Sequence, residues 1–263
     1  MPTRQIRRKK VKIITIANQK GGVGKTTTAL CFAALLNKMG HKTLLIDADS
    51  QCNSTDTYRA VTENTATLYD LVVDNEQCDV YEAIQHTEFG DIIAGDSMLA
   101  VADATLTGEG AFLKLKDALE DLNGYEYVVI DTNPTLNTML CNALVASDEV
   151  IIPINPARYT IKGLSDLTNT IVSIQSELNH SLKVRGLLLV DIERRANIDR
   201  QVERQLPEIA ETIGTTSFKV GIRHTAKVRE AQSARMPLVL YAPKSTAAVD
   251  YKSFVEEYLE GEK

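Results

Sequence analysis

One short stretch of the chain combines glycines with lysine and threonine, residue types that together can bind phosphate groups. Residues 20–27 read KGGVGKTT. Glycines let the backbone turn so that its N–H groups face an anion, and a following helix adds a favourable dipole. Lys25 is expected to neutralise phosphate oxygens, and the Thr26 hydroxyl is expected to ligate Mg²⁺. The predicted nucleotide-binding residues are Gly21, Gly22, Val23, Gly24, Lys25, Thr26 and Thr27.

Three carboxylates stand at the ends of apolar runs. Asp47 and Asp49 follow one run, and Asp131 ends another. Alternate positions on extended backbone face the same side, so Asp47 and Asp49 are both expected to address one assembly of Mg²⁺ and water. Asp131 is expected to hold Mg²⁺ through water and to sense the terminal phosphate. The predicted metal residues are therefore Thr26, Asp47 and Asp131.

The elements that must position these residues alternate between β-branched apolar runs and amphipathic stretches. Strands are expected at residues 11–17, 43–47, 127–131, 150–154 and 184–190. Helices are expected at residues 29–36, ended by Gly40, and at residues 111–122, 135–146 and 161–178. This alternation predicts an α/β fold, a doubly wound and mostly parallel sheet flanked by helices. Loops after parallel strands meet at one edge, which would join the phosphate loop and the carboxylates.

Composition narrows the class of protein. The chain has 263 residues and a net charge of −6, which does not favour a generally cationic nucleic-acid binder. It lacks the run of roughly 18 apolar residues that a membrane span needs, so no stable membrane insertion is expected. Its four cysteines form no C-x-x-C pair, which is typical of reduced thiols in a cytoplasm. We expect a cytoplasmic protein with a basic tail, residues 1–10, and a single domain, residues 11–260.

The glycine-rich loop departs from the ordinary G-x-x-x-x-G-K-[ST] pattern. Gln19 occupies the first glycine position, and Lys20 precedes the two glycines. With this deviant loop, several later segments resemble the ParA branch of the ParA/MinD family of deviant-Walker ATPases. These segments are residues 47–55, 131–134, 151–156, 190–202, 222–231 and 238–245. The resemblance runs from about residue 12 to residue 254, nearly the whole chain.

The resemblance implies ATP and Mg²⁺ as cofactors and a homodimer that forms with ATP. Lys20 is then expected to reach the phosphates bound by the partner subunit, and Asp49 to activate the attacking water. Lys20 and Asp49 are therefore the predicted catalytic residues of a P-loop ATPase. Ser50 and Cys52 stand where the family has proline and glycine, which bears on loop stiffness, and Asn133 replaces a family proline. Late loops near residues 221–224 are expected to recognise adenine.

Positive charge gathers locally late in the chain. Between Arg194 and Arg235 there are nine basic and five acidic residues, a surplus of four positive charges. In the ParA branch, ATP dimers bind DNA without sequence preference through basic residues of both subunits. By position, the predicted DNA-binding residues are Arg195, Lys227, Arg194, Arg200 and Arg223. The alternative is that these are solvated charges on helix surfaces, balanced by acids one turn away.

The expected function is an ATPase that dimerises with ATP, binds non-specific DNA at the nucleoid and drives partition of a chromosome, plasmid or other cargo. A ParB-like activator is expected to stimulate slow hydrolysis. The main alternative is a MinD-like or protein-cargo-positioning ATPase acting at a membrane or protein surface. A MinD-like protein needs a basic amphipathic C-terminal helix, whereas this chain ends in an acidic stretch. An iron–sulfur reductase is disfavoured because Cys141 lacks flanking glycines, and a tyrosine kinase because no tyrosine cluster is present.

Overall fold

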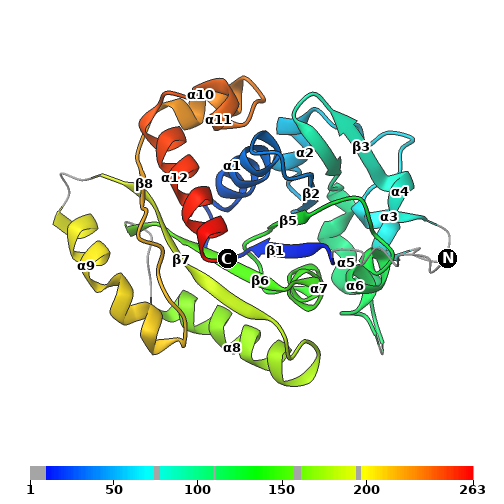
Figure 1. Ribbon diagram of the computed structural model, residues 1–263. Coiled ribbons are helices and arrows are strands. Elements are labelled where there is room, and N and C mark those ends of the chain that lie inside the picture. The colour runs from blue at the N-terminus through cyan, green and yellow to red at the C-terminus, as the bar shows by residue number, and fades with distance from the viewer. Residues whose placement is uncertain (1–9, 74–77, 109, 157–160, 194–196, 263) are drawn as a thin grey trace, which may run out of the picture.

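The computed structural model describes residues 10–73, 78–108, 110–156, 161–193 and 197–262. An eight-stranded sheet runs through it in the order β3-β4-β2-β5-β1-β6-β7-β8 (Figure 1). All neighbouring strands are parallel except β3 and β4. The strands are β1 (Lys12–Ile16), β2 (Thr43–Ala48), β3 (Ile84–Thr87), β4 (Gly90–Ile93), β5 (Tyr127–Thr132), β6 (Glu149–Ile154), β7 (Lys183–Ile192) and β8 (Ile222–Arg223).

Helices cover both faces of this sheet (Figure 1). One face carries α1 (Lys25–Lys38), α2 (Asn53–Tyr58), α10 (Lys227–Ser233), α11 (Leu238–Tyr241) and α12 (Thr246–Glu260). The other carries α3 (Leu68–Val73), α4 (Val80–Ala83), the 3₁₀ helix η1 (Ser97–Val101), α5 (Ala102–Thr105), α6 (Lys114–Leu119), α7 (Thr138–Ala146), α8 (Ile161–Glu177) and α9 (Asn197–Thr212). Because both faces are covered, every residue of β2, β5 and β6 is buried.

Aromatic packing fixes the last helix against the first. The ring of Phe32 in α1 lies 5.5 Å from that of Phe254 and 5.0 Å from that of Tyr258, both in α12. All three side chains are fully buried. Burying an aromatic side chain of this size contributes on the order of 2–3 kcal/mol, so the end of the chain is part of the core that holds α1 in place.

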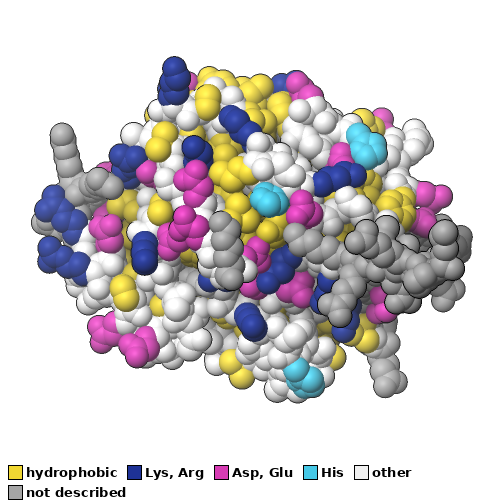
Figure 2. Space-filling model, in the orientation of Figure 1, with side chains coloured by type: hydrophobic (Ala, Val, Ile, Leu, Met, Phe, Trp, Pro, Cys, Tyr) yellow, Lys and Arg dark blue, Asp and Glu magenta, His cyan; other side chains and the backbone are white. Residues whose placement is uncertain are grey.

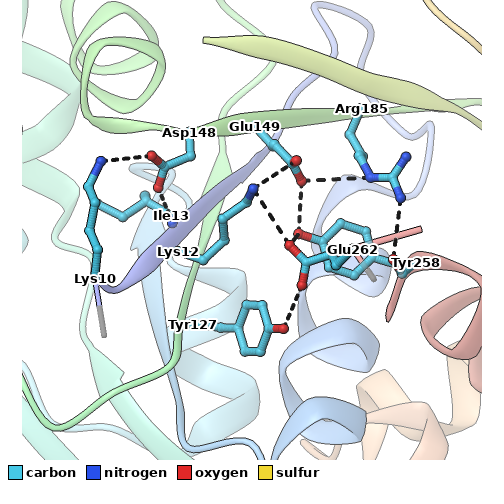
Figure 3. A network of polar contacts seen from close by, with 9 residues as sticks. All are labelled: Lys10, Lys12, Ile13, Tyr127, Asp148, Glu149, Arg185, Tyr258 and Glu262. Carbon is cyan, nitrogen blue, oxygen red and sulfur yellow. Dashed lines mark hydrogen bonds and ion pairs between the residues drawn. The ribbon is translucent and has the colours of Figure 1, made fainter. Parts of the chain in front are cut away.

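A polar network also ties the two ends of the described chain together, at the sheet edge where β1 begins (Figure 3). Glu149 is buried and accepts hydrogen bonds from Lys12 Nζ and from the Tyr258 hydroxyl, each at 2.8 Å. Glu262 accepts a hydrogen bond of 2.6 Å from the Tyr127 hydroxyl. Buried charges need such partners, and these partners lock the start of β1 to the end of α12.

The predicted fold class is confirmed, and the five predicted strands are β1, β2, β5, β6 and β7, with small shifts at their ends. The predicted helix 135–146 begins later, at Thr138, because the Asn137 side chain caps it by accepting a hydrogen bond from the Leu140 N–H. The predicted helix 111–122 is shorter, as α6. The short strands β3, β4 and β8 were not predicted. They are two to four residues long and too short for a periodic signal.

Candidate nucleotide-binding site

The glycine-rich loop lies between the end of β1 and the first residue of α1. Gly22 and Gly24 have φ angles of 69° and 79°, in the left-handed region that glycine adopts without a steric penalty. A Cβ on Gly24 would also lie 3.3 Å from Val190 Cγ2 of β7. The loop conformation therefore depends on glycine at these positions, and it directs the chain into α1 at Lys25.

Lys25 is buried, with 7% of its surface exposed. Its Nζ donates a hydrogen bond of 3.2 Å to the Lys20 carbonyl oxygen, which closes the loop. Burial lowers the pKa of Lys25, and the nearby charges of Asp131 and Asp49 act in the opposite direction. An ammonium group held in this way has donor capacity left for phosphate oxygens.

A pocket opens beside the loop at the carboxyl ends of β1, β2 and β5. It is lined by all of the predicted nucleotide-binding residues except Val23, and by Asp49. Val23 is buried. The Lys20 side chain is exposed and is not among the lining residues. Further lining residues, which sequence reasoning did not select, come from α1, α2, α10 and the loops after β2 and β5, and they are Leu30, Gln51, Asn53, Asp56, Thr57, Pro134 and Gln232.

Asp131 is fully buried at the end of β5. Its Oδ2 accepts a hydrogen bond of 2.8 Å from the Ser54 hydroxyl, whereas its Oδ1 has no partner among the described residues. Burial raises the pKa of Asp131 to about 8, and the neighbouring charge of Asp47 adds to the rise. A buried oxygen without a partner fits a metal-bound water, since Mg²⁺ keeps several waters and takes few protein ligands.

Asp47 is also fully buried, and both of its oxygens have partners. Oδ2 accepts hydrogen bonds from the Thr55 N–H and hydroxyl, each at 2.7 Å, and Oδ1 accepts one from the Asp49 N–H at 3.2 Å. Burial raises the pKa of Asp47 to about 6. Asp49 instead lines the pocket, and its Oδ1 accepts a hydrogen bond of 3.0 Å from the Gln51 N–H. The two aspartates therefore have different surroundings: Asp47 holds the loop that presents Asp49.

The helix that follows β2, α2, begins with Asn53 and contains Ser54 and Thr55, two residues that sequence reasoning did not select. Ser54 bonds to Asp131, and the Thr55 hydroxyl accepts a hydrogen bond of 2.8 Å from the Gly95 N–H while donating to Asp47. Both hydroxyl residues follow the aspartate pair by a few positions, in the first turn of α2. Hydroxyl residues a few positions after two aspartates are a sequence signal from which this role could have been predicted.

Cys52 occupies an unusual backbone conformation just before α2. Its φ of 53° is left-handed, a region that costs a residue with a side chain roughly 1–2 kcal/mol. The family that the sequence resembles has glycine at this position, and the observed left-handed backbone explains that preference. Burial raises the pKa of the Cys52 thiol to about 12, with Asp47 and Asp96 adding to the rise.

Among the predicted DNA-binding residues that the structure describes, none lines the pocket, and two have acidic neighbours. Arg223 Nη2 and Nε bind Asp250 at 2.6 Å and 2.7 Å, and Lys227 Nζ binds Glu230 at 2.6 Å. Arg200 is exposed on α9. Arg194 and Arg195 lie outside the described residues. Figure 2 shows Lys and Arg side chains on the α9 side of the molecule, interspersed with Asp and Glu.

Two further cations lie near predicted DNA-binding residues, and sequence reasoning did not select them as DNA contacts. Arg204 lies one turn after Arg200, and both are exposed and border a shallow hollow on α9. Lys244 borders another hollow with Lys227 and Thr246, where the N-terminal end of α12 lies. Only the tertiary structure brings Lys244 beside Lys227.

A phosphate loop at the end of β1, a buried lysine and aspartates after β2 and β5 define a P-loop nucleotide-binding protein. A family model described as an AAA domain matches residues 11–184. The sporulation initiation inhibitor protein Soj of Bacillus subtilis is 37% identical, over 94% of this chain and 97% of Soj. The chromosome partitioning protein ParA of Myxococcus xanthus is 34% identical, over 94% of this chain and 88% of that protein. The chain belongs to the ParA/Soj family of partition ATPases.

A solved structure supports the same assignment of the fold. The crystal structure of cobyrinic acid a,c-diamide synthase from Mycobacterium smegmatis, with bound ADP and magnesium, superposes with a TM-score of 0.81. The two chains are 27% identical, and the match covers 95% of each.

Proposed function

We propose that this protein is an ATPase that dimerises with ATP, binds DNA without sequence preference as that dimer, and moves a chromosome, plasmid or other cargo. The observation that carries the proposal is its similarity to Soj and ParA over nearly the whole chain, together with a lysine ahead of the phosphate loop. Residues 11–260 form the ATPase as one domain in this proposal. We therefore expect the protein to be located in the cytoplasm, at the nucleoid.

ATP and Mg²⁺ are the cofactors that the site fits. Lys25 and the N–H groups of the loop would bind the β- and γ-phosphates, and Thr26 and Asp131 would hold Mg²⁺, the latter through water. Bound Mg²⁺ would neutralise phosphate charge as it develops. Asp49 borders the pocket and would orient the attacking water, while Asp47 keeps the loop in place through Thr55. Positioning and charge stabilisation are the main contributions that such a site makes to hydrolysis.

Dimerisation gives Lys20 its role in this proposal. Its side chain is exposed, and it does not line the pocket of its own subunit. A second subunit that faces the pocket would insert its own Lys20 toward the phosphates. Hydrolysis is then slow in the monomer, and a ParB-like activator would accelerate it by acting on the dimer.

The DNA surface would combine α9 with the hollow beside α12. Arg200 and Arg204 are exposed one turn apart, and Lys227 and Lys244 lie near the start of α12. A helix N-terminus with lysines beside it favours phosphate oxygens. Such contacts address the DNA backbone, so they provide affinity without sequence preference.

The alternative of action at a membrane is less well supported. Most of the apolar side chains of α12 pack in the core, with Phe254, Val255 and Tyr258 fully buried, whereas Val249 is exposed. The buried side chains are therefore not available as the apolar face of a helix that lies on a lipid surface. Among the helices that the structure describes, none combines the length and apolar character that a bilayer-spanning helix needs.

The decisive experiment measures binding to a non-specific DNA duplex with ATP, with ADP and without nucleotide, across a salt series. The proposal predicts binding only with ATP, and log K falling by about 0.9 per phosphate neutralised as log salt rises. Equal DNA binding with ADP would contradict the proposal that DNA binding requires ATP. Absence of DNA binding, in a protein that still dimerises with ATP, would replace DNA by a protein surface as the site of action.

A further inference from the structure

A second groove lies far from the nucleotide pocket, at the end of the sheet where the central strand β1 begins. Its floor is apolar, formed by Leu119 and Leu122 near the end of α6, Ala146 at the end of α7, and the first part of β1. Val11, just before β1, and Ile13 of β1 are only partly buried. This groove has no part in the nucleotide chemistry, because the phosphate loop lies at the opposite end of β1.

The rim of this groove is acidic. Asp117, Glu120 and Asp121 are exposed along α6 and the turn that follows it, and Lys116 is the cation beside them. No side chain in the described part of the chain forms an ion pair with these three carboxylates. The rim therefore presents three exposed carboxylates that have no ion-pair partner among the described residues, although Lys116 lies beside them.

The chain itself enters the groove at Lys10. Lys10 Nζ contacts Asp148 Oδ1 at 3.0 Å, and Asp148 Oδ2 accepts a hydrogen bond of 2.9 Å from the Ile13 N–H (Figure 3). Lys10 and Asp148 both line the groove. Asp148 thus holds Lys10, the first residue that the structure describes, at the groove.

We propose that this groove binds the chain's own basic segment, residues 1–9. The segment carries Arg4, Arg7, Arg8 and Lys9, with Ile6 among them. The cations complement the unpaired carboxylates of the rim, and Ile6 suits the apolar floor. Attachment through Lys10 gives the segment a local concentration on the order of millimolar, so weak contacts are enough to hold it.

Docking has a consequence for the partners of the protein. When the groove holds the segment, its arginines are neutralised by the protein and are not available to a polyanion. Surface ion pairs of this kind weaken with salt, because the Debye length falls to about 3 Å at 1 M. Release of the segment by salt or by competition would then expose four cations near α6, on a different surface from α9 and α10.

The test uses the full chain with a photoreactive residue, Ile6→p-benzoylphenylalanine, which preserves an apolar side chain at that position. After irradiation, the cross-linked protein of monomer mass is digested and mapped by mass spectrometry. The proposal predicts cross-links within one chain to residues 116–123 or 146–148. Cross-links to other surfaces, cross-links only between chains, or no cross-link would overturn it.

Charge-reversal variants separate a specific groove from simple proximity. Glu120→Lys combined with Asp121→Lys is expected to lower the yield of these cross-links about fivefold or more, since it removes two ion pairs and adds repulsion. The matched control is Glu203→Lys with Glu208→Lys, two exposed acids of α9, which should leave the yield unchanged. All four residues are exposed, and an unchanged melting temperature confirms that each variant folds. An equal loss in both variants, or no loss in the first, would contradict the proposal.

Discussion

The nucleotide pocket and the basic surface of α9 to α12 use charge in opposite ways. In the pocket, Lys25, Asp47 and Asp131 are buried, and hydroxyl residues of α2 donate hydrogen bonds to both aspartates. On the basic surface, the cations are at least partly exposed, and Lys227 contacts an acid one turn away on its own helix. A buried charge without a partner lowers the stability of the fold by roughly several kcal/mol, so buried charges must be placed accurately. An exposed ion pair contributes only about 0–1 kcal/mol to stability.

This contrast shows why single residues should matter in the pocket and only sets of residues on the surface. Removing one buried charge leaves its neighbours unbalanced. Removing one exposed charge removes one phosphate contact among several. Variants in the two regions should therefore differ in the size of their effects, and in how those effects depend on salt.

The largest effect is expected for Lys25→Ala. Loss of the buried ammonium should weaken ATP binding by about 3–5 kcal/mol, or roughly a hundredfold to several thousandfold. Titration calorimetry with ATP and Mg²⁺ measures this loss. Lys38→Ala, an exposed lysine in the last turn of the same helix, is the control and should bind ATP normally. Normal ATP affinity in Lys25→Ala would break the contrast between the two regions.

Asp49→Ala should keep nucleotide binding and lose hydrolysis. A residue that positions the attacking water contributes a factor of about 100 or more to the rate. Phosphate release measures the rate, and ATP-dependent dimerisation measured by light scattering should persist. Asp56→Ala removes another carboxylate from the lining of the same pocket, and its rate should fall much less. Equal losses in both variants would assign the effect to pocket charge alone.

On the basic surface, Arg200→Ala with Arg204→Ala should lower affinity for non-specific DNA about tenfold, and each lost phosphate contact should reduce the salt slope by about one. Lys227→Ala should have a smaller effect, roughly twofold to threefold, because Glu230 already balances part of its charge. Lys252→Ala, an exposed lysine of α12 that contacts Glu256, is the control. DNA binding in the presence of ATP is the measurement. A larger loss in Lys227→Ala would move the surface toward α10.

The smallest effect is expected for Cys52→Gly in the loop that presents Asp49. Glycine removes the left-handed strain, of about 1–2 kcal/mol, but costs about 0.5–1 kcal/mol in chain entropy, so a net gain of up to about 1 kcal/mol is expected. The melting temperature should rise by about 1–3 °C. Cys52→Ala retains a Cβ and should show no such rise, whereas equal rises in both variants would mean that the thiol, not the backbone, is the cause.

Much of the fold was predictable because its signals are local. The apolar runs of β2, β5 and β6 are wholly buried and those of β1 and β7 are mostly buried, so they stand out without reference to the rest of the chain. The short strands β3, β4 and β8 were missed since two to four residues carry no periodicity. Helix α7 begins three residues later than predicted, because the Asn137 side chain caps it and so decides where it begins.

The amino-acid sequence by itself determined the phosphate loop, the carboxylates after β2 and β5, and the family. Glycine, lysine and threonine at these spacings act through backbone geometry within a few residues. Only the tertiary structure decided that Asp47 is held by Thr55, that Asp131 keeps one oxygen without a described partner, and that an acidic groove lies beside Lys10. These features depend on which strands are neighbours, and burial changes the energy of a charge far more than its place in the sequence does.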